Sequence, residues 1–310
     1  MYDVKTLDGR FLMSPRNDFT FKVLFGSENN KHLLSSLVSS IIREPVNEIT
    51  LCNPYLIRKY QYEKEGVLDI KLKNKTGLQV FIEMQAYDYK SMNKRMLFYW
   101  AKMYSDQLPK GKDYSELNRT IGINVLGYPG LLCDQPFSCY QVLEKRVHEV
   151  YCETFEIHVL KLAKNDIHER CINNKELLAW FTFLGATTEE EMIMAAEAME
   201  AVSEAFETLN VISQDKEIRD LYDSRQRFLL DQATRERDAR DMGIIEGIDK
   251  GIVKGRAEGI VEGRAEGVIE GRASAINEII HNMIENGMEI QDIARKTGIS
   301  EDEIRSILLE

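Results

Sequence analysis

Apolar positions along the first part of the chain alternate between two spacings. In residues 31–43 they recur every three or four residues, which predicts an amphipathic helix that Pro45 ends. Shorter apolar runs follow and predict strands, and the sequence Asn-Lys-Thr-Gly at 74–77 is typical of a hairpin turn between two of them. Residues 91–108 return to helical spacing. The predicted strands are 48–52, 67–73, 78–85 and 120–126, which gives the order α-β-β-β-α-β.

The middle of the chain extends this sheet and then becomes helical. Two more strand-like runs, at 138–143 and 154–162, are expected to join the sheet. The helices predicted after them are 177–183, a long acidic helix from Thr188, and 218–240. We therefore expect an α/β core with a mixed sheet in residues 1–186, followed by an all-helical C-terminal extension whose first, acidic part is 187–241.

Glycine occupies every fourth position from Gly243 to Gly271, eight times in all, within residues 242–274. Four residues advance an α-helix by about 40° beyond a full turn, so the glycines would wind slowly around a straight helix. Each glycine costs a helix about 0.8 to 1 kcal/mol relative to alanine, roughly 6 to 8 kcal/mol for the set. Two interpretations stay open: a helix stabilised by close contact with a second copy along its glycine face, or a flexible spacer.

Residues 275–310 contain two short helical patterns separated by a turn at 297–300. Ser300 is expected to cap the second helix, and Glu303 to complete a capping box. The pair is similar to half of a helix-turn-helix, and a packing hairpin without DNA contact is the alternative.

The composition, 44% hydrophobic, is that of a globular protein. No apolar run approaches the ~18 to 20 residues of a membrane span, and no secretory signal opens the sequence, so we expect a cytoplasmic protein without a membrane partner. The five cysteines form no Cys-x-x-Cys pair. His148, His158 and His168 match no metal-ligand spacing, so neither the cysteines nor these histidines are assigned a function.

The net charge of −11 is unevenly distributed. Residues 1–186 carry +3 and residues 187–310 carry −14, which together make −11. Since nucleic acid binds to positive charge, the first part is compatible with a polyanion and the second part would repel it.

Two carboxylates interrupt the apolar strands, Asp69 in Val-Leu-Asp-Ile and Glu83 in Val-Phe-Ile-Glu-Met. A buried carboxylate is costly unless it is paired or binds a metal. Side chains alternate along a strand, so Glu83 and Gln85 face the same way, and the hairpin brings Asp69 beside them. The two carboxylates and the backbone carbonyl of Met84 offer oxygen ligands of the kind that Mg²⁺ prefers. A solvated sheet face that carries both carboxylates is the alternative.

Four segments follow one another along the chain: SPRNDFTFKVLFG at 14–26, LDI at 68–70, IEMQ at 82–85 and KRMLFYWAKMY at 94–104. Together they resemble the Rpn family of bacterial recombination-promoting nucleases, and the resemblance covers about residues 11–190. It implies a PD-(D/E)xK restriction-endonuclease-like core and a DNA endonuclease that uses Mg²⁺ or, in its place, Mn²⁺. It assigns the metal ligands to Asp69 and Glu83 and the last motif position to Gln85.

That last position is usually lysine in the wider superfamily, and Gln85 cannot carry positive charge. An amide can orient a water or a phosphate oxygen, but it lacks the electrostatic effect of an ammonium group. We expect a substitute cation nearby, either Lys71 on the strand face of Asp69 or Lys94 or Arg95 at the start of the next helix.

Two groups of residues outside the strands complete the candidate site. Asp18 and Lys22 lie one helical turn apart, and Asp18 is expected either to cap the short helix or to support the metal site from outside its ligand set. Arg95, Tyr99 and Lys102 share one helix face, which either contacts phosphate or is solvated.

These expectations combine into one function and one rival. The function is that of a Mg²⁺-dependent DNA endonuclease, serving mobile-element recombination or phage defence and forming a homo-oligomer through its C-terminal tail. The rival is a catalytically silent nuclease fold that acts as an oligomeric module binding nucleic acid or protein.

Overall fold

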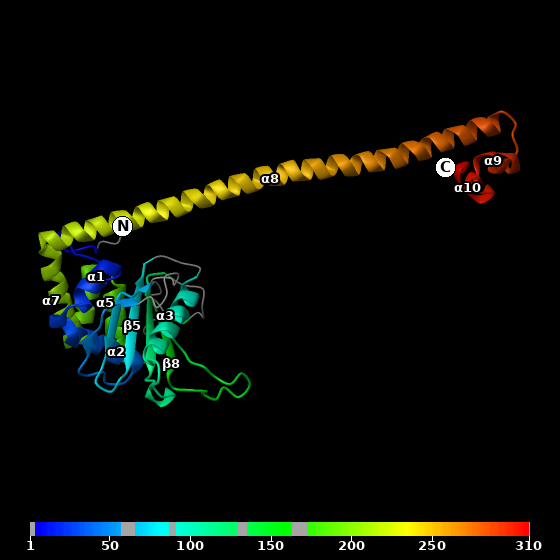
Figure 1. Cartoon of the computed structure of the whole chain (residues 1–310). Helices are drawn as coiled ribbons and strands as arrows, with labels where there is room; N and C mark the ends of the chain where they lie inside the picture. Colours follow the sequence, from blue (N-terminus) through cyan, green and yellow to red (C-terminus); the bar gives the residue numbers. More distant parts are fainter. Residues whose placement is uncertain (1–3, 57–65, 87–90, 129–134, 163–172, 310) are drawn as a thin grey trace. The chain divides into compact units, whose positions relative to one another are not determined.

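The computed structural model describes residues 4–56, 66–86, 91–128, 135–162 and 173–309. The chain divides into two compact units, Met1–Phe228 and Leu229–Glu310. The first unit has an α/β fold and the second is helical (Figure 1). The first unit therefore extends past residue 186 and includes much of the segment that the sequence analysis placed in an extension.

A six-stranded mixed sheet with the order β1-β4-β5-β6-β8-β7 forms the centre of the first unit. Strands β5, β6 and β8 run parallel, whereas β1 with β4, β4 with β5, and β7 with β8 pair antiparallel. The central strands are almost wholly buried, as expected of parallel strands covered on both faces. The strands are β1 (Thr50–Leu51), β4 (Ile70–Lys73), β5 (Gln79–Gln85), β6 (Thr120–Leu126), β7 (Phe137–Tyr140) and β8 (Phe155–Lys161), and β2 (Tyr55–Leu56) pairs separately with β3 (Gly66–Val67).

The turn between β4 and β5 fixes the register of the hairpin that carries the candidate site. The Asn74 side chain accepts a hydrogen bond from the backbone N–H of Leu78 at 3.0 Å. Gly77 has a φ of +93°, and a Cβ atom there would also clash with the side chain of Asn118, so glycine is required for both reasons. This turn leads into the pairing of Ile70 with Ile82.

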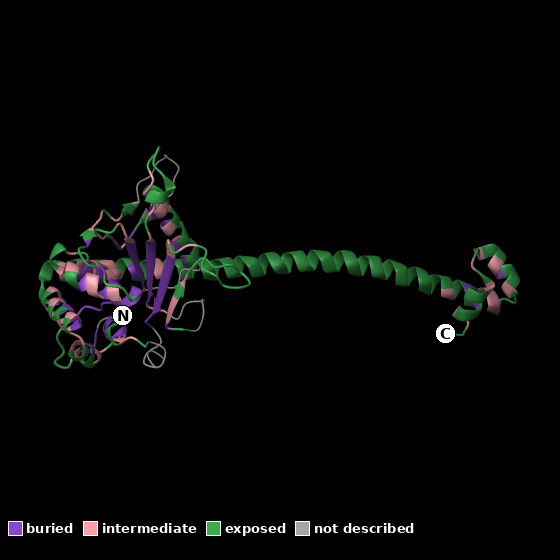
Figure 2. Cartoon of the chain, turned by 90° about the horizontal axis from the view of Figure 1, so that it is seen from below, coloured by how far each residue is buried: buried purple, intermediate pink, exposed green. Residues whose placement is uncertain are grey.

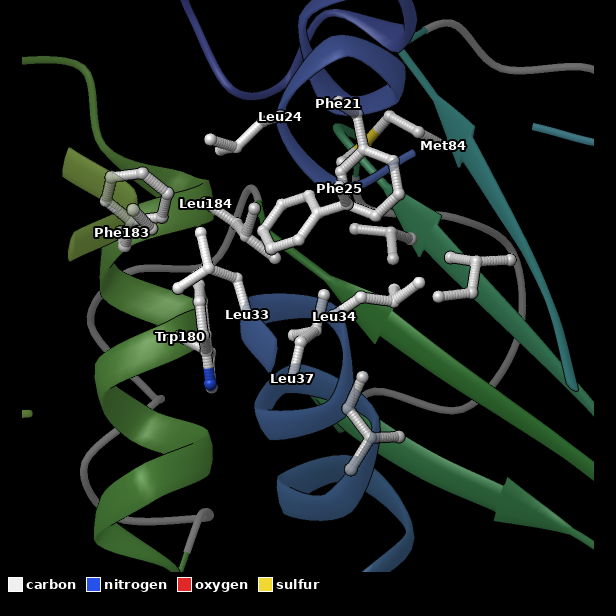
Figure 3. Packing of buried hydrophobic residues seen from close by; sticks show 14 of the residues in the cluster. Phe21, Leu24, Phe25, Leu33, Leu34, Leu37, Met84, Trp180, Phe183 and Leu184 are labelled. Atoms are coloured by element: carbon white, nitrogen blue, oxygen red, sulfur yellow. The ribbon is translucent and has the colours of Figure 1, made fainter. Parts of the chain in front are cut away.

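Helices cover the two faces of the sheet unequally. One face contributes to a large hydrophobic core in which Phe25 and Trp180 stack edge to face, with ring centroids 5.5 Å apart (Figure 3). The other face packs Phe81 against Met96 and Tyr99 of a single helix, α3 (Met92–Asp106). The helices of the large core are α1 (Asp18–Phe25), α2 (Lys31–Ile42), α5 (Lys175–Gly185), α6 (Glu189–Ala198), α7 (Glu200–Gln214) and the start of α8 (Lys216–Glu285). The elements η1 (Glu28–Asn30) and η2 (Tyr114–Glu116) are short 3-10 helices.

The prediction of a single long acidic helix from Thr188 is wrong, because the chain forms two helices, α6 and α7. They are separated at Met199, whose φ of −156° and ψ of 126° are extended. The break turns the chain so that Met192 of α6 and Leu209 of α7 are both buried in the large core. No glycine or proline marks this position, so the sequence offers no local signal for the turn.

Helix α8 (Lys216–Glu285) is 70 residues long and continues through all eight glycines. A Cβ atom at any of these glycines would meet nothing within 4 Å, so none of the described residues packs closely on the glycine face. The helix surface around them is exposed (Figure 2). At the end of the second unit, Ile280 packs with Ile293 and Ile304 of α9 (Ile290–Thr297) and α10 (Glu301–Ile307).

The cap of the last helix agrees with the sequence. Ser300 caps α10, and Glu303 completes the capping box, as predicted. Among the described helices, none has both the length and the apolar composition needed to cross a membrane.

Candidate active site

Asp69 and Glu83 lie side by side where β4 pairs with β5. The pairing joins Ile70 to Ile82, so Asp69, which immediately precedes β4, is placed across from Glu83. The backbone N–H of Met84 donates to Asp69 Oδ2 at 2.7 Å, which holds the aspartate against the neighbouring strand. Only 9% of the Asp69 side chain and 1% of the Glu83 side chain are exposed. The hairpin therefore buries two carboxyl groups next to one another, as the sequence predicted.

Two basic side chains from different helices reach these carboxyls. Lys22 Nζ, on α1, lies 2.8 Å from Asp69 Oδ1. Arg95 Nη2, on α3, lies 3.2 Å from Glu83 Oε2. The two basic side chains remain 41% and 37% exposed, so each links a buried carboxyl to solvent.

Gln85 and Tyr99 complete the polar surroundings. Gln85, which is buried, donates from Nε2 to Glu83 Oε2 at 3.3 Å. The Tyr99 hydroxyl accepts a hydrogen bond from Arg95 Nε at 2.8 Å, and the guanidinium lies 5.2 Å from the centre of the Tyr99 ring. Tyr99 therefore positions the guanidinium that faces Glu83.

Two buried oxygen atoms at the site lack a donor among the residues that the structure describes. Within the described residues, neither Glu83 Oε1 nor Asn124 Oδ1 has a hydrogen-bond partner. Glu83 and Asn124 are register partners in the parallel strands β5 and β6, so both side chains stand on one face of strands about 4.8 Å apart. A buried acceptor without a donor costs about 1 to 3 kcal/mol, and an ionised one costs more. Two such acceptors on adjacent strands suit a cation or a cation-bound water.

Burial raises the pKa of both carboxyl groups. The pKa of Glu83 rises to about 8, first because of burial and then because of the negative charge of Asp69, although Arg95 acts in the opposite direction. Burial likewise raises the pKa of Asp69, while the ammonium of Lys22 lowers it. Each carboxyl opposes the ionisation of the other, so added positive charge would stabilise the ionised pair.

The residues of this site fit a divalent cation that prefers oxygen ligands. Asp69 and Glu83 provide two carboxylates, and the unsatisfied Glu83 Oε1 is a ligand atom that no protein donor occupies within the described residues. Hard cations such as Mg²⁺ are bound through one or two carboxylates and retain several waters. The backbone carbonyl of Met84 lies between Glu83 and Gln85 on β5 and stays a predicted ligand.

Of the three cations proposed to replace the missing lysine, the structure brings Arg95 to the carboxyls. In the described part of the chain, neither Lys71 on β4 nor Lys94 on α3 forms an ion pair with Asp69 or Glu83. Lys71 is half-buried and Lys94 is exposed. Lys102, also half-buried, lies about two turns beyond Arg95 on α3.

The prediction that Asp18 caps α1 is wrong, because the preceding residue performs that function. The Asn17 side chain accepts hydrogen bonds from the N–H groups of Phe19 and Thr20. Asp18 is the first residue of α1, and both of its carboxylate oxygens accept from Arg225 Nε at 3.1 Å. The charge of Asp18 also contributes to the raised pKa of Asp69, which places Asp18 near the site.

Sequence reasoning missed Asn124, Arg225 and the direct contact of Lys22 with Asp69. Asn124 interrupts an apolar strand, Thr-Ile-Gly-Ile-Asn-Val-Leu, as Asp69 does, so the same signal could have found it. Arg225 follows Asp18 by 207 residues, and no local pattern connects the two.

Comparison with known families matches residues 15–239 to a family described as PD-(D/E)XK nuclease family transposase. Neither the curated proteins nor the solved structures provide a match. The matched residues include every member of the site from Asp18 to Arg225 and most of the α/β unit, which confirms the fold expected from the resemblance. The chain therefore belongs to the PD-(D/E)XK nuclease family transposases.

Proposed function

We propose that this protein is a metal-dependent endonuclease that hydrolyses phosphodiester bonds in DNA, with Asp69 and Glu83 as ligands of Mg²⁺ or Mn²⁺. The observation that carries the proposal is the buried pair of carboxyls, one of which has an oxygen without a donor in the described residues. Such a pair is costly in a metal-free fold and useful in a metal-binding one. Membership of a nuclease family supports the same chemistry.

A bound divalent cation would lower the pKa of a water ligand and neutralise charge that develops on the phosphate. Side chains of the protein would position the attacking water and the phosphate. Gln85 lies beside Glu83 and has both a donor and an acceptor, so it would orient the attacking water. The Arg95 guanidinium, which Tyr99 positions, would bind a phosphate oxygen.

Lys22 would supply the ammonium that Gln85 lacks. Its Nζ atom already lies 2.8 Å from Asp69, so positive charge reaches the carboxyl pair from α1 instead of from β5. The Lys22 side chain is more exposed than either carboxyl, which leaves it accessible to a phosphate group in solution. Asp18, held by Arg225, would support α1 and thereby the position of Lys22.

Self-association through α8 is the second part of the proposal. Exposed isoleucine and valine side chains accompany the glycines, among them Ile244, Ile248, Ile252 and Val261. Contact between two copies along this surface would bury them and offset the glycine penalty of roughly 6 to 8 kcal/mol. This exposed surface also favours the alternative function, a catalytically silent oligomeric module, because self-association requires no chemistry at the carboxyl pair.

Cleavage of supercoiled plasmid in the presence of Mg²⁺ tests the nuclease directly. We expect the parent protein to nick or linearise the plasmid and Asp69→Ala to lose this activity. Asp113→Ala is the matched control, because Asp113 is an exposed aspartate of the same unit. Undiminished cleavage by Asp69→Ala would refute the assignment of the site, and an inactive parent would favour the oligomeric module.

Truncation after residue 240 tests self-association. The shortened chain retains the whole first unit, so it should fold and keep the site. We expect light scattering to give a smaller number of copies per particle than for the full chain. The same number of copies in both proteins would contradict an interface in α8.

A further inference from the structure

A second group of metal-ligand side chains lies on strands β7 and β8, away from the carboxyl pair. Cys139 and His158 are register partners across these antiparallel strands, and Glu156 precedes His158 by two residues. Antiparallel partners and alternate residues share one face of a sheet, so the three side chains stand together. This face also carries Leu160 and belongs to the large core, whereas Glu83 and Phe81 occupy the opposite face with α3.

The three possible ligand atoms are close enough to share one ion. Cys139 Sγ lies 3.8 Å from His158 Nε2, and His158 Nε2 lies 3.0 Å from Glu156 Oε2. One ligand atom from each residue lies within 4.8 Å of the other two. A tetrahedral ion with bonds of about 2.0 to 2.3 Å separates its ligands by about 3.3 to 3.8 Å. Small side-chain adjustments would therefore bring all three atoms to bonding distance.

We propose that Cys139, Glu156 and His158 form a site for a borderline-soft transition-metal ion such as Zn²⁺. Sulfur and imidazole ligands favour zinc or cobalt over Mg²⁺, whereas the oxygen ligands at Asp69 and Glu83 have the opposite preference. Cys139 is exposed on an edge strand, so an ion can enter from solvent and retain a water as its fourth ligand. The chain would then bind two different metals on opposite faces of one sheet.

Neighbouring side chains orient the proposed ligands. Arg119 Nη2 donates to both oxygens of Glu156 at 2.9 Å, and Gln141 Nε2 donates to Oε1 at 3.1 Å. A carboxylate has about four lone-pair positions, so these bonds leave capacity for an ion. The Phe137 ring stacks on the His158 ring at 5.7 Å and restricts its rotation. Neighbouring groups that hold the ligand side chains in a fixed orientation are typical of metal sites.

Hydrogen bonding alone does not account for the buried histidine. His158 is almost fully buried, and within the described residues its Nδ1 atom has no partner. A histidine with a purely structural function normally satisfies both ring nitrogens, because an unsatisfied buried nitrogen costs free energy. The imidazole instead directs Nε2 toward a thiol and a carboxylate.

The thiol is protonated before metal binds. Partial shielding of the thiol from water, and then the charge of Glu156, raises the pKa of Cys139 to about 11, so at neutral pH this cysteine is a poor nucleophile. Binding of a divalent ion to sulfur would displace the thiol proton to solvent, which makes the metal affinity increase with pH.

Cobalt absorption of the full-length protein tests the site, because thiolate-bound Co²⁺ has a charge-transfer band that oxygen ligands do not give. In excess Mg²⁺, we expect the band of the parent protein to saturate at one equivalent of Co²⁺ and to disappear on addition of Zn²⁺. Cys139→Ser should abolish the band and weaken Zn²⁺ binding by at least about 100-fold. Cys152→Ser, at another described cysteine, and Asp69→Asn should both keep it.

Because Cys139 is exposed, its replacement leaves the core intact, and an unchanged circular dichroism spectrum would establish that the variant folds. His158→Gln should lower the affinity as Cys139→Ser does. Absence of a thiolate band in the parent protein, or its persistence in Cys139→Ser, would overturn the proposal. These outcomes do not depend on DNA cleavage, so they are independent of the proposed nuclease activity.

Discussion

Glu83 on β5 and Glu156 on β8 are both buried glutamates of the same sheet, yet their carboxyl groups have opposite electrostatic environments. Burial and the nearby charge of Asp69 raise the pKa of Glu83 to about 8. Burial alone would also raise the pKa of Glu156, but hydrogen bonds from His158 and Arg119 lower it to about 2.

The difference lies in the number and type of partners. Arg119 approaches Glu156 with two hydrogen bonds of 2.9 Å, and Gln141 adds a third from a neutral amide. Glu83 has one guanidinium at 3.2 Å, one amide donor, Gln85, at 3.3 Å, and a second carboxyl beside it. A buried carboxylate that accepts several charged and neutral hydrogen bonds stabilises the fold, whereas one with fewer donors requires positive charge from elsewhere. A bound cation would therefore stabilise the ionised form of Glu83 more than that of Glu156.

Removal of Arg119 should have the largest effect on stability. Arg119→Ala would leave Glu156 ionised and buried without its main partner, and breaking such a pair costs about 3 kcal/mol or more. Urea unfolding of metal-free protein measures this loss. Arg95→Ala is the matched change at Glu83 and should cost less, because Glu83 can take up a proton at neutral pH. Equal losses in the two variants would contradict the difference between the two glutamates.

The two glutamates should also give the metal-free protein opposite pH dependences. The folded protein holds the Glu83 proton above the ordinary pKa of 4.5, so stability should fall as the pH rises from about 5 to 8. For Glu156 the folded pKa is depressed, so its contribution is present above pH 4.5 and is lost as the pH falls toward 2.

Melting temperatures across this range, measured with a chelator present, check both signs. Glu83→Gln should reduce the loss of stability between pH 5 and 8, and Glu156→Gln should reduce the loss of stability as the pH falls toward 2. If Glu83→Gln left the decline between pH 5 and 8 unchanged, the raised pKa would belong to another group.

The smallest effect is expected for Gln85→Lys. Lys22 and Arg95 already bring positive charge to the carboxyl pair, so a third cation should change the rate of plasmid cleavage by less than about threefold. Lys22→Met is the informative comparison, since loss of one preorganised charge at a reacting site costs about 100-fold or more in rate. A large gain in Gln85→Lys would mean that neither existing cation serves the reaction.

The hairpin could be predicted from the sequence because its determinants are local. Short apolar runs identify the strands, and the turn at 74–77 fixes which residues face one another. Asp69 and Glu83 were therefore placed correctly beside each other. Arg95 was one of three open choices, since a helix face can be read from sequence but its distance to a strand cannot.

Contacts between elements far apart in the sequence were not predictable in this way. Arg225 reaches Asp18 across 207 residues, and the break at Met199 depends on a core that forms only in the fold. Strands β7 and β8 were both expected, but the long connection between them leaves their register undetermined by sequence. For that reason Cys139 and His158, partners in the structure, showed no recognisable motif.

Thermal melting with and without Mg²⁺ tests most directly whether Asp69 and Glu83 bind the metal. A ligand that binds only the folded state raises its melting temperature by mass action, so Mg²⁺ or Mn²⁺ should stabilise the parent protein. Asp69→Asn removes the charge that opposes ionisation of Glu83, so without metal it should melt no lower than the parent, and it should lose the metal response together with plasmid cleavage. Asp113→Asn should keep both. Retention of metal stabilisation and cleavage by Asp69→Asn would contradict the assignment of the metal site to this hairpin.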